Sequence, residues 1–320
     1  MWRLLFFLPL FALFADKAPI TKKKAGEEYP WFTGPLIALS PEVIERGHIN
    51  IEPYVFALAN TGVYDSEWKS QKHPTLWNLF LQPQMTFGLT KFMDFYILPT
   101  IYYNLCESES SWGWGDLNLG FDFQLYHDVY VDHDWYPNVK FSLREVFPTG
   151  KYDRLNPKKK GTEIGGEGTF DTLVELVVGK LFHFTGIYFL SSRLVFTYTV
   201  SSPVSVHGFN FYGGGAGTKG TVYPGQTFNL DLALECALSR NWAFAIDLIG
   251  NWESHNRFKG NLGASATPIA TGSSFQFTLA PALEYNWSPN WGVIFGSWFT
   301  AAGRNAPQFF SGVIAVNYYK

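Results

Sequence analysis

The chain of 320 residues is poor in charged residues and in cysteine. Asp, Glu, Lys and Arg make up 16% of it, against roughly 25% in an average soluble domain. The formal net charge is -3, so no basic excess points to nucleic acid as a partner. The two cysteines, Cys106 and Cys236, cannot build a disulfide framework. After residue 15 no apolar run approaches the roughly 18 to 20 residues of a spanning helix, which argues against a helical membrane protein.

Aromatic residues are abundant, with 30 Phe, 17 Tyr and 12 Trp. Because long apolar runs are missing, the hydrophobic side chains must alternate with polar or small ones. Residues 226–238 show this pattern, with one column of large side chains and one of small or polar ones: Phe228, Leu230, Leu232, Leu234, Cys236 and Leu238 against Asn229, Asp231, Ala233, Glu235 and Ala237. A period of two is typical of a strand with one apolar face.

Twelve such segments follow one another: 49–60, 77–90, 93–105, 116–126, 137–147, 170–182, 185–198, 226–238, 242–253, 274–286, 291–301 and 308–319. They are longer than the roughly 5 to 6 residues usual in soluble sheets. Their length suits a tilted membrane-spanning strand of about 9 to 11 residues plus its ends. We therefore predict an all-β fold, a transmembrane antiparallel β-barrel of about 12 strands and of the outer-membrane type, over residues 49–320. Closure is required because lipid cannot hydrogen-bond an open sheet edge.

The connections between these segments alternate in length. Short ones are 91–92, 183–184, 239–241 and 287–290, and longer ones are 61–76, 106–115, 148–169, 199–225 and 254–273. Periplasmic turns and external loops alternate in this way in outer-membrane barrels. Connection 127–136 does not fit, because it is longer than its periplasmic assignment predicts. Trp242, Trp287 and Trp291 flank the short turns, and Tyr318 and Tyr319 close the chain on the same side, as expected of an aromatic belt at the membrane surface.

The N-terminus carries a targeting signal. Arg3 precedes the apolar stretch Leu4 to Phe14, and Ala15 is followed by a polar tract, the order of a secretory signal peptide. We predict that residues 1–15 are this signal, cleaved near Ala15, and the alternative is an uncleaved anchor. The expected location is the bacterial outer membrane, and the expected partners are the barrel-assembly machinery, outer-membrane lipid and lipopolysaccharide, and a small-molecule solute.

Residues 16–48 form a periplasmic N-terminal segment in this prediction. Its part from Trp31 to Ile44 is apolar, contains Pro35 and Pro41, and shows no clear period. It cannot be a spanning strand without making the strand count odd. It is either a periplasmic tether or a plug that tucks into the lumen, where Tyr54, Phe56, Tyr96 and Tyr102 are the expected contacts.

Charged side chains fall on the polar columns of the predicted strands. An Arg or Lys facing lipid at mid-depth costs roughly 2–4 kcal/mol, so these side chains are predicted to face the lumen. There they either fill a narrow barrel as a network or line it and select solutes. The candidates are Glu52, Asp94, Asp122, Lys140, Arg144, Glu175, Arg193, Asp231, Glu235, Asp247 and Glu284.

The densest cluster of histidine and carboxylate lies in connection 127–136 and comprises His127, Asp128, Asp132, His133 and Asp134. Such groups could bind a divalent metal or form a proton-abstracting dyad. An omptin-like protease needs them on the external rim, whereas the predicted topology puts them on the periplasmic side, so we interpret them as solvated turn residues. The run Lys158 to Lys160 could contact lipopolysaccharide phosphates, but such runs in loops are usually only solvated. We predict no catalytic, cofactor-binding or metal-binding residue.

The middle of the chain carries a family resemblance. The segment from Phe147 to Asp153, Phe-Pro-Thr-Gly-Lys-Tyr-Asp, follows an alternating strand and precedes the glycine-rich stretch from Gly161 to Gly168. Over residues 137–182 the chain resembles the outer-membrane proteins of the phenol-degradation meta-pathway family. The resemblance implies a barrel channel for aromatic or other apolar compounds. One departure is the C-terminus, where the last aromatic, Tyr319, lies one residue inside the end.

The expected function is that of an outer-membrane channel or uptake protein for small apolar or aromatic solutes, acting by passive diffusion rather than as an enzyme. The alternatives are an outer-membrane hydrolase of protease or lipase type and a structural or adhesive surface barrel. Single-channel conductance and a liposome hydrolysis assay on one preparation discriminate among them.

Overall fold

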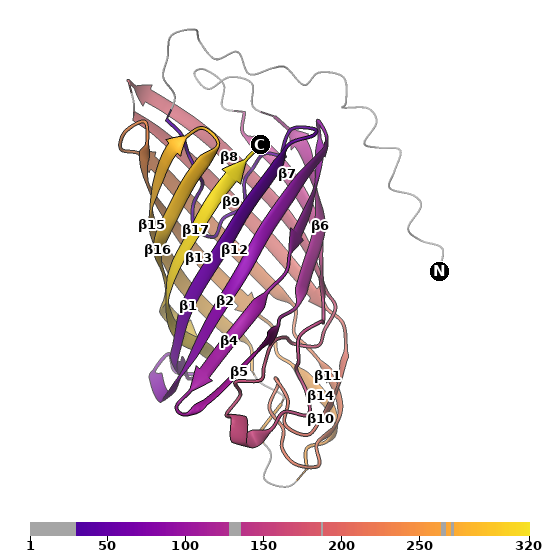
Figure 1. The fold of residues 1–320 in the computed structure, drawn as a ribbon. Coiled ribbons are helices and arrows are strands. Elements are labelled where there is room, and N and C mark those ends of the chain that lie inside the picture. Colours follow the sequence, from indigo (N-terminus) through magenta and orange to yellow (C-terminus); the bar gives the residue numbers. More distant parts are fainter. Residues whose placement is uncertain (1–29, 128–135, 187, 264–266, 270–271) are drawn as a thin grey trace, which may run out of the picture.

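A closed antiparallel barrel forms the body of the computed structural model, which describes residues 30–127, 136–186, 188–263, 267–269 and 272–320. Strand β1 pairs with both β17 and β2, so the sheet closes into a barrel (Figure 1). Ten crossings are single strands: β1 (Ile49–Tyr64), β2 (Ser70–Thr90), β7 (Asn138–Phe147), β8 (Asp171–Thr185), β9 (Tyr188–Ser201), β12 (Thr227–Ala237), β13 (Trp242–Glu253), β15 (Ser274–Ser288), β16 (Trp291–Arg304) and β17 (Ala306–Tyr319). The fold is therefore all-β, as predicted.

The remaining two crossings are each built from two strands. β3 (Met93–Leu98) continues into β4 (Ile101–Cys106), and β5 (Glu109–Trp114) continues into β6 (Leu117–Tyr126). Proline has no N–H to give to a ladder, and Pro99 lies in the first break. The Gly115 N–H donates to the Thr100 carbonyl over 2.8 Å, which joins the two breaks side by side. Counted this way, the predicted twelve crossings are confirmed.

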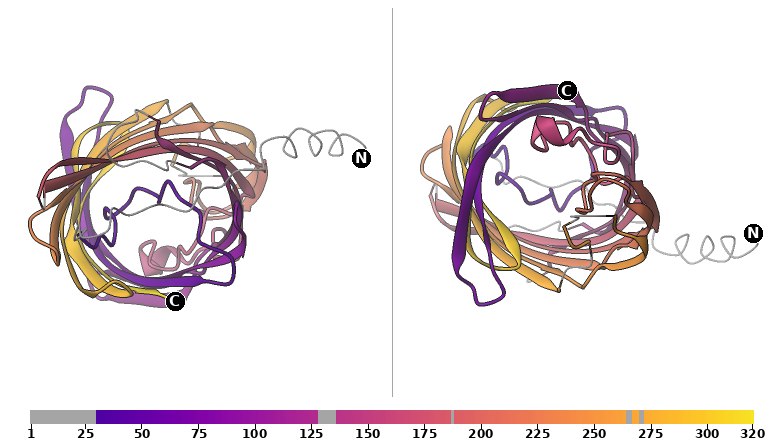
Figure 2. Two further views of the ribbon diagram at one scale, coloured as in Figure 1. Left: turned by 90° about the horizontal axis from the view of Figure 1, so that it is seen from above. Right: turned by 90° about the horizontal axis from the view of Figure 1, so that it is seen from below.

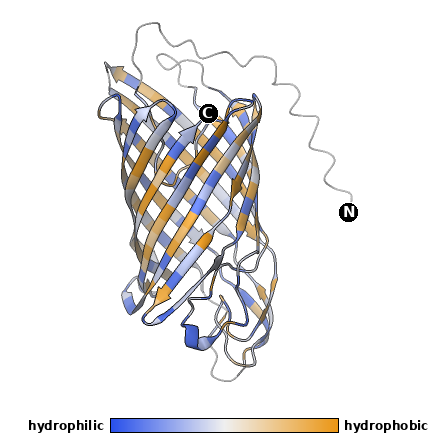
Figure 3. Ribbon diagram, viewed as in Figure 1, coloured by the Kyte–Doolittle hydropathy of each residue, from blue (hydrophilic) through white to orange (hydrophobic). Residues whose placement is uncertain are grey.

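Inward and outward residues alternate along each crossing with the predicted phase. On β12, Leu232 is 38% exposed on the outer surface, whereas its neighbour Ala233 is fully buried. Figure 3 shows the same alternation around the barrel as orange bands between paler or blue ones. The apolar outer surface is what a barrel needs in order to lie in lipid.

One end of the barrel, here named the turn end, carries the tight connections β2–β3, β12–β13 and β15–β16 and the C-terminal residue (Figure 1). An outward belt of aromatic rings surrounds part of it. Trp242 contacts Tyr285 at 4.8 Å between ring centroids, Trp287 contacts Trp291 at 6.1 Å, and Trp291 contacts Tyr318 at 4.4 Å.

At the opposite end, the loop end, two predicted loops are wrong. Connection 61–76 is a hairpin, because β1 runs to Tyr64 and β2 begins at Ser70. Connection 106–115 is also a hairpin, in which only residues 107–108 separate β4 from β5. The first five residues of β2 are exposed on both faces, so the alternation that marks a strand in the sequence fades there.

The other long connections hold structure of their own. Residues 148–169 contain a single 3-10 turn, η2 (Pro157–Lys159). Residues 199–225 and 254–273 contribute a small antiparallel sheet of β10 (Val204–His207), β11 (Lys219–Tyr223) and β14 (Arg257–Asn261). No helix among the described residues is long and apolar enough to cross a membrane.

Candidate solute pathway

Residues 30–47, named here the inner segment, lie inside the barrel (Figure 2). Both ends of the segment are fixed at the turn end, where the Trp31 N–H donates to the Arg240 carbonyl at 3.0 Å and the Gly47 N–H to the Gly88 carbonyl at 2.9 Å. Its middle reaches deeper into the barrel. There Leu36, 2% exposed, belongs to an apolar cluster on the inner wall.

Wall carboxylates hold the first half of the inner segment by its main chain. Asp247 on β13 accepts hydrogen bonds from Leu36 N–H at 3.0 Å and from Ala38 N–H at 2.9 Å. Glu284 on β15 accepts one from Thr33 N–H at 2.7 Å. An irregular segment leaves its N–H groups without ladder partners. Carboxyl oxygens on the wall supply these partners.

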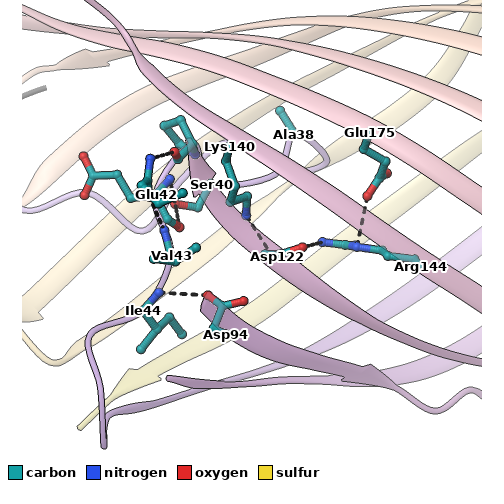
Figure 4. Close-up of polar contacts among 12 residues, drawn as sticks. Ala38, Ser40, Glu42, Val43, Ile44, Asp94, Asp122, Lys140, Arg144 and Glu175 are labelled. Atoms are coloured by element: carbon teal, nitrogen blue, oxygen red, sulfur yellow. Dashed lines mark hydrogen bonds and ion pairs between the residues drawn. The ribbon is translucent and has the colours of Figure 1, made fainter. Parts of the chain in front are cut away.

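The second half of the inner segment is held in the same manner from the other side of the barrel. Asp94 on β3 accepts from the Ile44 N–H at 2.8 Å (Figure 4). Gln124 on β6 accepts from the Val43 N–H at 2.8 Å and donates to the Pro41 carbonyl at 3.1 Å. Both walls of the barrel thus form hydrogen bonds with the segment, and most of these bonds go to its main-chain groups.

Glycines in the wall make room for this arrangement. A side chain on Gly88 would place its Cβ 2.0 Å from the Glu45 carbonyl oxygen, and one on Gly179 would place it 2.5 Å from Cγ of Pro41. Any larger residue at either place would have to displace the inner segment.

A buried ion network lies behind the second half of the inner segment. Lys140 Nζ and Asp122 are 3.0 Å apart, and the Arg144 guanidinium lies 3.5 Å from Asp122 and 3.0 Å from Glu175 (Figure 4). All four side chains are no more than 7% exposed. The network neutralises charges that are costly to bury alone.

Seven of the eleven predicted lumen residues take part in these two kinds of contact. Asp94, Asp247 and Glu284 bind the inner segment, and Asp122, Lys140, Arg144 and Glu175 form the network. Arg193 donates to the Ala38 carbonyl of the inner segment at 3.4 Å and forms a separate pair with Glu235 at 3.3 Å. Glu52 and Asp231 are buried on the wall, at 5% and 3% exposure.

Aromatic side chains line the inner wall between the inner segment and the loop end. Phe56 lies 5.6 Å from Phe80 and 6.4 Å from Trp298 between ring centroids, and Leu36 and Ile37 belong to the same cluster. Phe80 in turn borders a cavity of about 180 Å³. We name this continuous surface the aromatic track. The charge-based prediction missed Phe80 and Trp298, although both stand on inward positions of alternating strands.

The cavity at the end of the aromatic track combines rings with amides. Its lining comprises Asn78, Phe80, Gln82, Thr100, Tyr102, Asn104, Ile164 and Gly165. Asn78 donates to Asn104 at 2.9 Å, and Asn104 donates to the Ile164 carbonyl at 2.9 Å. Tyr102, expected to contact the inner segment, instead donates to the Glu163 carbonyl at 3.0 Å.

Other predicted features have different outcomes. Residues 1–15 and the cluster members Asp128, Asp132, His133 and Asp134 lie outside the described residues. Over the described ranges, no group of three His, Cys, Asp or Glu side chains could hold a metal ion. In the lysine run, Lys159 pairs with Glu109 at 3.0 Å and Lys160 pairs with Glu107, so acidic neighbours occupy both.

Comparison with known proteins rests on shape. No protein-family model and no curated protein matches the sequence. The crystal structure of an outer-membrane channel from Pseudomonas putida F1 superposes with a TM-score of 0.68 at 13% identity, covering 89% of this chain and all of that one. The translocator domain of the autotransporter NalP from Neisseria meningitidis gives a TM-score of 0.44 at 12% identity, with coverage of 86% and 89%. The fold is thus shared with an outer-membrane channel.

Proposed function

We propose that this protein is an outer-membrane channel for passive uptake of small apolar or aromatic solutes, with the loop end outside and the inner segment closing the pathway. The similarity in fold to an outer-membrane channel supports the location and the class of activity. The motif from Phe147 to Asp153 further supports membership of the phenol-degradation meta-pathway family.

The observation that carries the proposal is the position of the aromatic track. It leads from the cavity beside Tyr102 and Phe80 to the tip of the inner segment at Leu36. Rings offer an apolar solute dispersion and stacking contacts, and the amides of Asn78 and Asn104 can bond a hydroxyl group. A solute that enters at the loop end thus finds a favourable surface as far as the inner segment.

The inner segment closes this route in a reversible way. Between its two fixed ends, its hydrogen bonds go to wall side chains rather than to a strand ladder, so the middle of the segment can leave without breaking the barrel wall. Undocking exposes Asp247, Glu284 and Asp94 to water, which solvates their charges and offsets part of the lost bonding energy. Passage past the segment is then governed by how often it undocks.

The test is the conductance of the purified protein in planar bilayers before and after deletion of residues 31–44. We expect larger single-channel conductance, and faster uptake of a monocyclic aromatic into liposomes, in the deletion variant. The double substitution Asp247→Asn and Glu284→Gln, which keeps the full chain, is expected to change both in the same direction. Unchanged conductance and uptake in correctly assembled variants would refute the gating role, and hydrolysis of the liposome lipid would point to a hydrolase.

A further inference from the structure

The small sheet of β10, β11 and β14 lies at the loop end (Figure 1). Its two faces differ in chemistry. One is apolar and buried: Val204, Val206 and Val222 are at most 4% exposed, and they pack with Ile269 and Phe258. The strand register fixes what the other face carries, since residues paired across antiparallel strands share a face. Every second residue of β11 and β14 therefore points away from this core.

Three cations occupy that opposite face. On β11 it carries Lys219, and on β14 it carries Arg257 and Lys259, and all three are exposed. Lys259 pairs with Thr221, two residues from Lys219, and Arg257 pairs with Tyr223. Positions two apart on a strand and diagonal neighbours across strands are both separated by about 7 Å. We name Lys219, Arg257 and Lys259 the cationic face.

The cations of the cationic face lie close to one another and are not neutralised by acidic side chains of the described residues. Arg257 and Lys259 lie 5.9 and 5.3 Å from the centroid of the same ring, that of Tyr223. Within the described parts of the chain, none of the three cations has a carboxylate within ion-pair distance. Asp153, which contacts His207 of β10 at 3.2 Å, also lies 4.0 Å from Arg154.

The lysine run on the same end of the barrel provides the contrast. Lys159 and Lys160 each have a glutamate partner on the β4–β5 hairpin. Clustered cations without such partners repel one another, and an anion with several charges relieves that repulsion. An external polyanion would therefore stabilise the cationic face, whereas Lys159 and Lys160 are already neutralised by their glutamate partners.

We propose that the cationic face binds the phosphate groups of lipopolysaccharide in the outer leaflet. The assignment rests on the proposed function in one respect, because that function puts the loop end outside, where this lipid surrounds a barrel. Lipopolysaccharide carries several phosphates on one headgroup, which suits a row of three cations in which Lys259 lies about 7 Å from both Lys219 and Arg257. Arginine can bind a phosphate through two parallel hydrogen bonds, and the lysines act as point charges.

The experiment measures binding of purified, detergent-solubilised full-length protein to lipopolysaccharide that retains both lipid A phosphates. Each basic residue near an anionic lipid surface contributes roughly fivefold in affinity, so removing three weakens binding on the order of a hundredfold. The variant is Lys219→Gln, Arg257→Gln and Lys259→Gln combined. The matched control is Lys158→Gln, Lys159→Gln and Lys160→Gln, which removes the same charge from the same end and should change the affinity less than about threefold.

Two further probes identify the source of the phosphate. Binding is expected to fall for the same lipopolysaccharide after dephosphorylation, and to be weaker for phosphatidylglycerol vesicles. Equal losses in the two triple variants, undiminished binding of dephosphorylated lipid, or equal binding of phosphatidylglycerol would each overturn the inference. Heat-modifiable gel mobility confirms that both variants are assembled. Conductance is recorded on the same samples. If the protein conducts but does not bind lipopolysaccharide, only this inference is refuted. If it binds lipopolysaccharide but does not conduct, only the proposed channel function is refuted.

Discussion

Replacing Asp247 with Asn tests the suspension of the inner segment most directly. The carboxylate accepts two N–H groups, from Leu36 and Ala38. An Asn side chain of the same size can accept only one of them, and its NH₂ group would face the other. Hydrogen bonds to a charged group are worth about 1.5–3 kcal/mol, and the surviving bond becomes a weaker neutral one, so the docked state loses about 2–4 kcal/mol. The undocked population should rise between about 30-fold and 700-fold.

The assay is single-channel recording combined with hydrogen exchange over residues 33–44. We expect a larger open fraction and faster exchange of these amides in the Asp247→Asn variant. Asp231→Asn is the matched control, because Asp231 is also a buried wall aspartate but accepts no hydrogen bond from the described part of the inner segment. If both variants show the same open fraction and exchange, the main-chain bonds to Asp247 do not hold the segment.

Three other predictions follow from the wall, the topology and the loops. Leu232→Arg should prevent assembly, because it puts a charge in lipid at a cost of roughly 2–4 kcal/mol; Ala233→Arg should assemble but displace the inner segment, and heat-modifiable mobility and conductance separate the two. An epitope tag in 148–169 should be accessible on intact cells and one in 239–241 should not, and the opposite result would invert the barrel. Burial alone would raise the pKa of Glu163, but the hydrogen bonds it accepts outweigh this and hold the pKa below its ordinary value. Its contribution to loop stability is therefore present above the unfolded-state pKa and lost as the pH falls through the folded one, so protease cleavage of this loop should increase in acid and, for Glu163→Gln, at neutral pH.

Alternation predicted the crossings because lipid and lumen impose opposite demands on adjacent residues. Leu232 and Ala233 show both demands within two positions. Beyond the apolar band the outward residues no longer need to be apolar. The continuation of β1 and β2 into a long hairpin therefore could not be recognised in the sequence. The small sheet could not be predicted for the same reason. Its strands have only four or five residues, and they bury one face against other loops rather than against lipid or lumen.

The contents of the lumen were harder to predict than its wall. Charge on the inner columns pointed to the acids and bases, but the pattern could not tell which would bind each other and which the inner segment. Asp247 and Asp231 look alike in the sequence, and only the folded position of Leu36 and Ala38 separates their roles. Phe56 was expected in the lumen, but Phe80 and Trp298 were missed, because these inward rings read as ordinary apolar strand residues.

The carboxylates of the wall bind the main chain of the inner segment and do not depend on its particular side chains. Asp247, Glu284 and Asp94 bind N–H groups that almost every amino acid supplies. Exchanging side chains along the segment should therefore alter how well it closes the proposed pathway and what it repels, while the attachment itself persists. A collection of variants of residues 33–44 on an unchanged barrel would give channels of graded permeability from a single scaffold.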